Sequence, residues 1–201
     1  MLKKLINGIF AGILISIGGT VFLSCDNRYV GAVLFAVALL CICILGFSLY
    51  TGRICYIADK PDREKFSVLL LGLLGNLIAT VGCGYAIRYA IPAAADTALA
   101  SCTAKLTQTF PSTLIRAIFC GILIYLAVEI YKKKNDVVGI LFCIPVFILS
   151  GYEHSIADMF YFAASGIVSL RAFGFIWTVI LGNSIGGLLI PVLSKIGKKD
   201  E

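Results

Sequence analysis

The residue with the clearest chemical potential is His154, the only histidine among the 201 residues of the chain. It stands in the segment SGYEHS (150–155), directly after Glu153 and inside an otherwise apolar run. An imidazole with an unperturbed pKa of about 6.5 can share a proton with a weak-acid anion, or donate one to it. The alternative is a structural role, in which a neutral imidazole hydrogen-bonds a neighbouring segment.

Two carboxylates lie close to the histidine in sequence. Glu153 and Asp158 need partners, because an unpaired charge in an apolar region is costly. Candidate partners are Lys105, Arg116 and Arg88, which all fall in or beside polar segments. A lysine near a pore mouth would attract anions, whereas the alternative is a solvated lysine in a surface loop.

The composition indicates that lipid surrounds these residues. The chain is 60% apolar and 14% charged, whereas soluble domains carry about 45–50% apolar and about 25% charged residues. Six apolar runs reach the length of about 20 residues that a membrane-spanning helix needs. They cover residues 5–24, 30–52, 66–91, 111–131, 137–163 and 172–193. The sequence therefore predicts an all-α, multi-pass membrane protein with no separate soluble domain.

The charges lie in short clusters between the apolar runs. Their net value of +6 forms no basic face with interleaved aromatics, so no nucleic-acid partner is expected. Five basic residues fall on the side away from the N-terminus: Arg28, Arg88, Lys105, Arg116 and Arg171. Twelve fall on the N-terminal side: Lys3, Lys4, Arg53, Lys60, Arg63, Lys65, Lys132, Lys133, Lys134, Lys195, Lys198 and Lys199. This asymmetry predicts that both termini are cytoplasmic, in an inner (plasma) membrane.

The N-terminal 25 residues have the basic head, apolar run and terminal Cys25 of a lipoprotein signal peptide. Phe22 occupies the position three before the cysteine, where such sites usually have Leu. The segment is also half of an internal repeat, so we expect it to be retained. The eight cysteines lack metal-type spacing and mostly lie in apolar runs, which predicts free thiols and no metal or other cofactor.

An internal repeat relates the two halves of the chain. FAGILIS (10–16) matches FCGILIY (119–125), and GNLI (75–78) matches GNSI (182–185), at offsets of 109 and 107 residues. Polar interruptions fall between them, SLYTG (48–52) and SGYEHS (150–155). Three spans per unit would invert the second unit in the membrane. The chain is thus predicted to be one transmembrane channel domain, 1–201, with repeats at about 5–91 and 111–193.

The two interruptions should meet near the membrane midplane, because non-helical backbone at that depth is tolerated only where it is buried in protein or lines a cavity. The first is centred on Thr51 and the second contains His154. Asn76 and Asn183 place an amide deep in an apolar span of each repeat. We expect these amides to hydrogen-bond the loop backbone that the interruptions free.

These motifs resemble those of the formate/nitrite transporter family. GYEHSIADMF (151–160) is similar to that family's fifth-helix loop, usually written GFEHSIANMF, and FSLYTG (47–52) is similar to its second-helix loop. GNLIATVG and GNSIGG resemble its third- and sixth-helix motifs. AKLTQTFPSTLIRAIFCGILIYLAV (104–128) is similar to its segment from the lysine to the fourth helix. The resemblance covers essentially the whole chain.

The resemblance implies an aquaporin-like fold, with six transmembrane helices per subunit as an inverted 3+3 repeat. Its second and fifth helices are interrupted, each protomer has its own pore, and five protomers form a ring. It implies that His154 is the central pore histidine, that Thr51 faces it, and that Lys105 is a vestibule lysine with Glu153 as its network partner. It also implies that Leu49 and Tyr50 sit at one hydrophobic constriction, while Phe35, Leu39 and Phe147 match the other by their spacing from the two loops.

Three residues depart from the family pattern. Ser48 replaces the usual acidic residue before LYT, and Gly121 stands where the fourth helix commonly has Asn. Asp158 stands where EHSIA is normally followed by Asn. Because the last two positions belong to the polar network around Lys105 and Glu153, that network is expected to be rebuilt here.

The expected function is transport of small monovalent anions or their weak acids, with formate or nitrite as the leading substrate. Hydrosulfide and then acetate or lactate are alternatives within the family, and a channel and a proton-coupled carrier both remain open. A membrane-embedded enzyme using His154 would need convergent acid or metal-ligand groups that the chain lacks. A neutral-solute pore would be expected to carry paired NPA loops, but NLI and NSI lack the proline.

Overall fold

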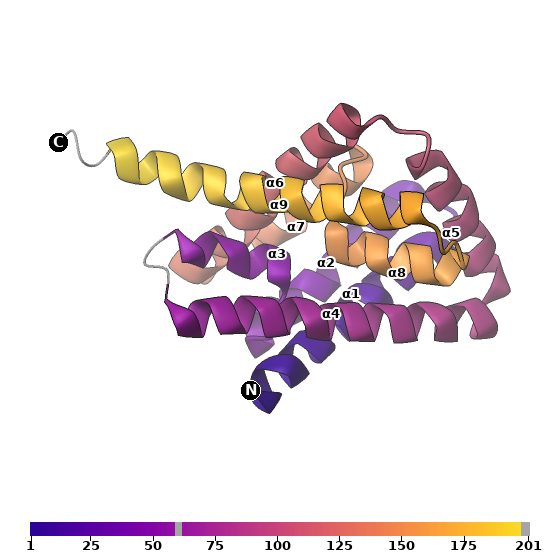
Figure 1. The fold of residues 1–201 in the computed structure, drawn as a ribbon, viewed down its shortest axis with the longest axis horizontal. Coiled ribbons are helices and arrows are strands. Elements are labelled where there is room, and N and C mark those ends of the chain that lie inside the picture. The colour runs from indigo at the N-terminus through magenta and orange to yellow at the C-terminus, as the bar shows by residue number, and fades with distance from the viewer. Residues whose placement is uncertain (59–61, 198–201) are drawn as a thin grey trace.

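The computed structural model describes residues 1–58 and 62–197, and all regular structure in these ranges is helical (Figure 1). Lys60, Lys198 and Lys199, three of the basic residues assigned to the N-terminal side, lie outside the described residues. The helices are α1 (Leu2–Ser24), α2 (Arg28–Leu45), α3 (Tyr50–Arg53), the 3-10 helix η1 (Ile54–Ile57), α4 (Arg63–Ala90), α5 (Pro92–Lys105), α6 (Phe110–Lys134), α7 (Val138–Leu149), α8 (Ser155–Ser165) and α9 (Leu170–Gly197).

Within the described ranges, five helices are long and apolar enough to cross a membrane: α1, α2, α4, α6 and α9. The remaining apolar run, predicted as one span over 137–163, forms the 12-residue α7 and the 11-residue α8. The prediction of an all-helical chain made mostly of apolar helices is confirmed.

Residues 92–110, which separate the third and fourth apolar runs and contain Lys105, begin with helix α5 and not with a surface loop. Pro92 occupies its first turn, where the missing N–H costs nothing, and the alanine-rich segment that follows has high helix propensity. Ala94, Ala98 and Cys102 recur every four residues and form the buried face, which places α5 against α8. The expectation of a loop was wrong, and Lys105 lies at the end of a fixed helix.

Two breaks interrupt the apolar helices near the centre of the molecule. The first follows α2 at Gly46, whose φ of +72° lies in the left-handed region that favours glycine. The second follows α7 and contains Gly151, with a φ of +69°. The first break lies slightly earlier than predicted, because residues 50–52 of the SLYTG segment already belong to α3. The second extends to His154, after which α8 begins.

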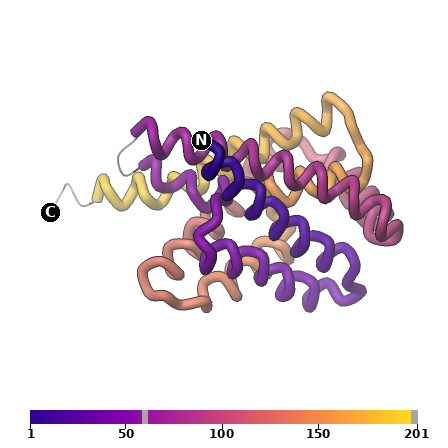
Figure 2. Tube along the Cα trace, turned by 90° about the horizontal axis from the view of Figure 1, so that it is seen from below, coloured from indigo at the N-terminus to yellow at the C-terminus, as the bar shows by residue number. Residues whose placement is uncertain are grey.

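Each break is flanked by a closely packed pair of helices, α1 with α4 and α6 with α9. A Cβ atom at Gly75 would lie 2.4 Å from the carbonyl oxygen of Leu5, and one at Gly186 would lie 2.0 Å from that of Ile118. Real Cβ atoms do not approach so closely, so glycine permits both contacts. The two helices that precede the breaks, α2 and α7, pack together on one side of the molecule (Figure 2).

The molecule has two distinct ends along the long helices. The N-terminus, the start of α4 and the C-terminal part of α9 lie toward one end, which we call the terminal face (Figure 1). The ion pair between Lys4 and Glu64, at 3.5 Å, joins α1 to α4 there, and Lys195 donates to the carbonyl oxygen of Ala58. The opposite end carries α5, and we call it the α5 face.

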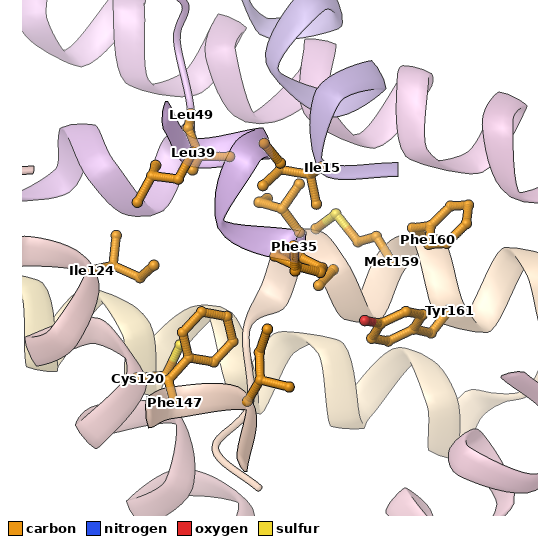
Figure 3. Packing of buried hydrophobic residues seen from close by; sticks show 14 of the residues in the cluster. Ile15, Phe35, Leu39, Leu49, Cys120, Ile124, Phe147, Met159, Phe160 and Tyr161 are labelled. Carbon is orange, nitrogen blue, oxygen red and sulfur yellow. The ribbon is translucent and has the colours of Figure 1, made fainter. Parts of the chain in front are cut away.

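The space between the breaks is filled by apolar side chains. Ile15, Phe35, Leu39, Leu49 and Phe147 converge there from α1, α2, the first break and α7 (Figure 3). All five are at most 3% exposed. A tightly packed apolar centre of this kind separates the two ends of the molecule.

Candidate functional site

The two breaks meet at a hydrogen bond between Thr51 and His154. Thr51 Oγ1 lies 2.9 Å from His154 Nε2, and the residues are 1% and 2% exposed. Thr51 is held by α3, and His154 is the residue that precedes α8. A polar pair at the centre of an apolar protein is therefore fixed from both halves of the chain.

The hydrogen bonds of His154 indicate its tautomer. The backbone N–H of Ala157 donates to Nδ1 at 3.2 Å, so that the imidazole caps α8. A nitrogen that accepts a hydrogen bond carries no proton, so the proton of the neutral ring is assigned to Nε2. Nε2 then donates to Thr51 Oγ1. A second proton on the ring would break the cap, so this geometry favours the hydrogen-bonding alternative for the resting state.

Asn76 and Asn183 hold the backbone of the two breaks in matching ways. Asn76 Oδ1 accepts from the N–H of Tyr50, while its Nδ2 donates to the carbonyl oxygens of Ser48 and Gly8, over distances of 2.7–3.0 Å. Backbone N–H and C=O groups at this break have no partner within a helix. The Asn76 amide supplies the hydrogen bonds that they would otherwise lack.

The second amide repeats this pattern. Asn183 Oδ1 accepts from the N–H of Ser155, and its Nδ2 donates to the carbonyl oxygens of Glu153 and Ala117, over 2.8–2.9 Å. Both asparagines are fully buried. Each one ties a break to a helix of the same half, α1 for the first and α6 for the second.

Lys105 and two carboxylates form a charged cluster beside His154. The Lys105 ammonium pairs with Glu153 Oε2 and with Asp158 Oδ1, the latter at 3.0 Å. Gln108 Nε2 donates to Glu153 Oε1 at 2.7 Å. Glu153 and Asp158 are 2% and 1% exposed, so one cation stands between two buried carboxylates.

The protonation of Lys105 follows from these neighbours. The residue ends α5, which is not one of the spanning helices. Burial alone would lower the pKa of its ammonium, but Asp158 and Glu153 outweigh burial and raise this pKa above its usual value. Lys105 therefore stays charged at neutral pH. Asp158 Oδ2 is buried without a hydrogen-bond partner among the described residues, so the cluster is incompletely satisfied.

The two arginines considered as partners for these carboxylates lie elsewhere. Arg116 Nη1 donates to the carbonyl oxygen of Gly151 at 2.8 Å, which fixes the second break instead. Arg88 lies against Gly166 in the turn after α8. Of the three candidates, only Lys105 contacts the carboxylates.

A cavity of about 400 Å³ opens above this cluster on the α5 face. The residues of its wall that matter for the site are the charged cluster, Gln108, His154, two arginines and two of its aromatic residues. They are Arg28, Phe35, Lys105, Gln108, Arg116, Phe147, Glu153, His154 and Asp158. The cavity thus leads from the charged cluster to the histidine.

Two phenylalanines close the floor of this cavity. The rings of Phe35 and Phe147 pack edge to face with centroids 6.3 Å apart, and Phe147 lies 5.8 Å from the ring of His154. Leu39, grouped with these two by sequence spacing, instead lines a small cavity with Leu49. Leu39 lies one helical turn past Phe35 along α2, so the two side chains line different cavities, and their grouping in one constriction stays a prediction.

The side chain of Tyr50 reaches α9. Its hydroxyl lies 2.8 Å from Ser184 Oγ of α9, and the residue lines neither this cavity nor the one at Leu49. The tyrosine thus joins α3 to α9, and its part in a constriction with Leu49 stays a prediction.

The structure shows what surrounds Gly121 and Ser48, two of the departures from the family pattern. A Cβ atom at Gly121 would lie 2.4 Å from the carbonyl oxygen of Asn183, so this position permits close contact of α6 with α9. Ser48 donates its N–H to the carbonyl oxygen of Asn7 at 3.1 Å, and its own carbonyl accepts from Asn76. Both of these hydrogen bonds of Ser48 involve its backbone and not its side chain.

Sequence reasoning missed Gln108 and the anchoring role of Arg116. Gln108 follows Lys105 by three residues and donates to the same glutamate, while Thr113 donates to Gln108 Oε1 at 3.1 Å. The only available signal was a polar side chain beside a lysine in a segment read as a loop. Among residues 1–58 and 62–197 no three His, Cys, Asp or Glu side chains are grouped so that they could hold a metal ion.

Comparison with known sequences gives a consistent result. A family model described as "Formate/nitrite transporter" matches residues 1–196. The chain is 29% identical over 186 residues to "Formate-nitrite transporter 2" of Toxoplasma gondii. That match covers 82% of this chain and 40% of the relative, so the chain spans less than half of the relative's length.

Comparison with solved structures shows the same fold. A structure described as "FNT family ion channel" has a TM-score of 0.83 at 23% identity and covers 98% of this chain and 90% of its own. A "Pentameric formate channel with formate bound" has a TM-score of 0.81 at 20% identity, covering 100% of this chain and 98% of its own. At these identities the likeness concerns the arrangement of the helices.

Proposed function

Because the chain belongs to the formate/nitrite transporter family, we propose that it carries small monovalent anions or their weak acids across a membrane, with formate or nitrite as the leading substrate. The observation that carries this proposal is the buried Thr51–His154 pair at the meeting point of the two breaks. A pair of hydrogen-bonding groups enclosed by apolar rings can hold one small anion or acid while excluding its hydration shell.

The proposed path begins at the cavity on the α5 face. Its wall holds three cations, Arg28, Lys105 and Arg116, against the two carboxylates of the cluster, and this excess of positive charge attracts anions. Beyond Phe35 and Phe147 the substrate would meet His154 and Thr51, which can offer an N–H and a hydroxyl. It would then pass Leu49 toward the terminal face.

Each residue of the site has a proposed role. His154 Nε2–H is the donor that replaces hydration at the narrowest point, and Thr51 is its partner. Lys105 draws the anion in, while Glu153 and Asp158 hold the lysine and set the net charge of the cluster. Asn76 and Asn183 support the breaks and do not touch the substrate.

The overall organisation follows from the same membership. We propose a single channel domain of six spans, in which α2 with α3 and α7 with α8 are the interrupted ones. The halves, about 5–91 and 111–193, would form an inverted, aquaporin-like repeat, with matching amides at Asn76 and Asn183 in support. Five copies would form a ring with one pore each, in a plasma membrane, with both termini cytoplasmic.

The test is a flux panel on purified protein in liposomes. Uptake of formate, nitrite, hydrosulfide and acetate would be compared with swelling in glycerol. We expect formate or nitrite uptake well above that of empty liposomes, no glycerol permeation, and at least tenfold loss on His154→Phe. Glycerol permeation without anion uptake would contradict the proposal, and preferential hydrosulfide or acetate uptake would change the substrate but keep the class.

A further inference from the structure

A second, smaller cavity lies on the other side of the apolar centre. It has a volume of about 50 Å³, and Leu39, Leu49 and Gly52 form its inner wall. Successive turns of α2 place Phe35 on the large cavity and Leu39 and then Ile42 on the small one. The two cavities therefore lie at different depths on either side of the Thr51–His154 pair.

The polar groups around the small cavity are unusual because its wall contains two cations and no carboxylate. Arg53 and Lys132 both line it. Arg53 Nη2 donates to the carbonyl oxygens of Gly46 and Phe47, at 3.0 and 3.3 Å, which anchors the guanidinium at the first break. Neither Arg53 nor Lys132 forms an ion pair among the described residues.

The nearest acidic residue on α6 does not neutralise this pair. Glu129 pairs with Lys133 at 2.9 Å instead. Lys132 places its ammonium 3.7 Å from the ring centroid of Tyr56, a cation–π contact that orients the charge without cancelling it. The Tyr56 hydroxyl is buried and has no hydrogen-bond partner in the described part of the chain. Two oriented cations and an unpaired hydroxyl thus surround a space that fits one small molecule.

We infer that Arg53 and Lys132 form a binding site for one small monovalent oxoanion at the terminal-face end of the pathway. This inference rests on the proposed function and adds a second binding position to it. Guanidinium and ammonium N–H groups bind carboxylate-type oxygens through short, charge-assisted hydrogen bonds, and formate and nitrite both present two such oxygens. The site is separate from the Lys105 cluster, whose two carboxylates already satisfy that cation.

The test measures the half-saturation concentration for formate uptake from each face separately, in right-side-out and inside-out membrane vesicles. Lys132→Gln should raise this concentration about tenfold from the terminal face, since a charge-assisted hydrogen bond contributes about that factor. From the α5 face it should change by less than about twofold. Arg53→Gln should act in the same direction. If its lost contacts to Gly46 and Phe47 prevent assembly, Lys132→Gln carries the test alone.

Lys134→Gln is the matched control, because it removes the same charge, two residues away, from a side chain that does not line the small cavity. Repeating the assay in about 1 M potassium gluconate, where the screening length falls to about 3 Å, separates binding from long-range attraction. If Lys132 belongs to a binding site, Lys132→Gln should still raise the half-saturation concentration at high salt. Loss of the effect there, an unchanged half-saturation concentration, or an equal effect of Lys134→Gln overturns the inference.

These outcomes are distinguishable from failure of the proposed function. A parent protein that conducts neither formate nor nitrite overturns the proposed function and this inference together. A parent protein that conducts them, with Lys132→Gln and Arg53→Gln both indistinguishable from it, overturns only the second site.

Discussion

Asp158 adds a second carboxylate to the charged cluster, at a position where the family normally has Asn. With Lys105 charged and both carboxylates ionised, the three groups sum to one net negative charge beside the proposed path of an anion. Two buried carboxylates sharing one ammonium are costly to ionise together. The charge that a passing anion meets therefore depends on whether the cluster holds a proton.

We expect Asp158→Asn to assemble and to flatten the pH dependence of formate uptake. The amide oxygen can still accept from Lys105, but the second negative charge is gone. Removing a like charge at roughly 8 Å in an effective dielectric near 20 is worth about 2 kcal/mol. Formate uptake at a pH of about 7.5 should thus rise up to roughly thirtyfold relative to the parent, and uptake at about 5.5 should change little. Stopped-flow uptake into liposomes measures this.

Asp96→Asn provides the control for this substitution, because Asp96 is exposed on α5. Its profile should superimpose on that of the parent. Lys105 cannot supply the pH dependence, since its raised pKa keeps it protonated throughout this range. An Asp158→Asn variant with an unchanged profile would show that this carboxylate does not act on the anion, and one that fails to assemble would show a structural role.

His154→Asn tests whether the imidazole acts as a fixed donor or as a proton carrier. Asparagine can cap α8 as the imidazole does, so the protein should assemble. It can also donate a hydrogen bond, but it cannot titrate. We expect formate uptake to fall about tenfold at every pH from about 5.5 to 7.5, with the shape of the profile retained. A changed shape would instead mean that the ring gains a second proton during transport and leaves Ala157 uncapped.

At the level of helices, the two buried asparagines determine how the breaks are held. Asn76→Ala or Asn183→Ala leaves three backbone groups without their partner. Because each unsatisfied buried group costs about 1–3 kcal/mol, either change should lower the free energy of unfolding by more than about 2 kcal/mol. Unfolding by SDS titration measures this. Asn27→Ala, which removes an exposed helix cap, should cost about 1 kcal/mol, and equal costs would contradict this account.

The contact of α6 with α9 permits a second test of packing. Gly121→Ala adds a Cβ atom 2.4 Å from the carbonyl oxygen of Asn183, so the helices must separate at the residue that holds the second break. We expect lower thermal stability by several degrees and a loss of formate flux. Gly174→Ala on α9, where a Cβ atom would meet nothing within 4 Å, is the control and should be neutral or slightly stabilising. Similar losses for the two variants would refute the packing explanation.

The helices were predictable where one physical signal dominated. Long apolar runs identified α1, α4, α6 and α9 nearly to their ends, because the thickness of the bilayer sets the length of a spanning helix. The helix α5 was missed because its signal is alanine propensity on a short, amphipathic stretch rather than hydropathy. The demand of a buried carboxylate for a cation left three candidates, and only the family resemblance pointed to Lys105 as the partner of Glu153.

Side-chain grouping was harder to predict than the helices. Leu39 and Phe35 lie four residues apart on one face of α2, and sequence spacing alone cannot show that the apolar centre divides them between two cavities. Arg88 and Arg116 were equivalent to Lys105 by sequence, and only the turn of the second break shows that Arg116 binds Gly151. Such assignments depend on contacts between segments about 35 to 120 residues apart.

At the scale of the whole molecule, the outer surface of a single chain exposes many large apolar side chains. Large apolar side chains such as Phe142, Phe173 and Trp177 are 67%, 61% and 54% exposed, so lipid or other subunits must enclose them. We expect native mass spectrometry from nanodiscs to give five copies of the 21.6 kDa chain. A tetramer, or a monodisperse monomer that still conducts formate, would contradict the pentamer.

The two asparagines also bear on the order in which the protein can be made. Asn76 joins Gly8, Ser48 and Tyr50, so every group that it binds has been synthesised once residue 76 has left the ribosome. The first break can therefore reach its final backbone arrangement during translation. Its counterpart needs Ala117, Glu153 and Asn183, and becomes fixed only after residue 183 has been synthesised. Until His154 has been synthesised Thr51 lacks its partner, so a chain that stalls before that point cannot contain the buried pair on which the proposed pore depends.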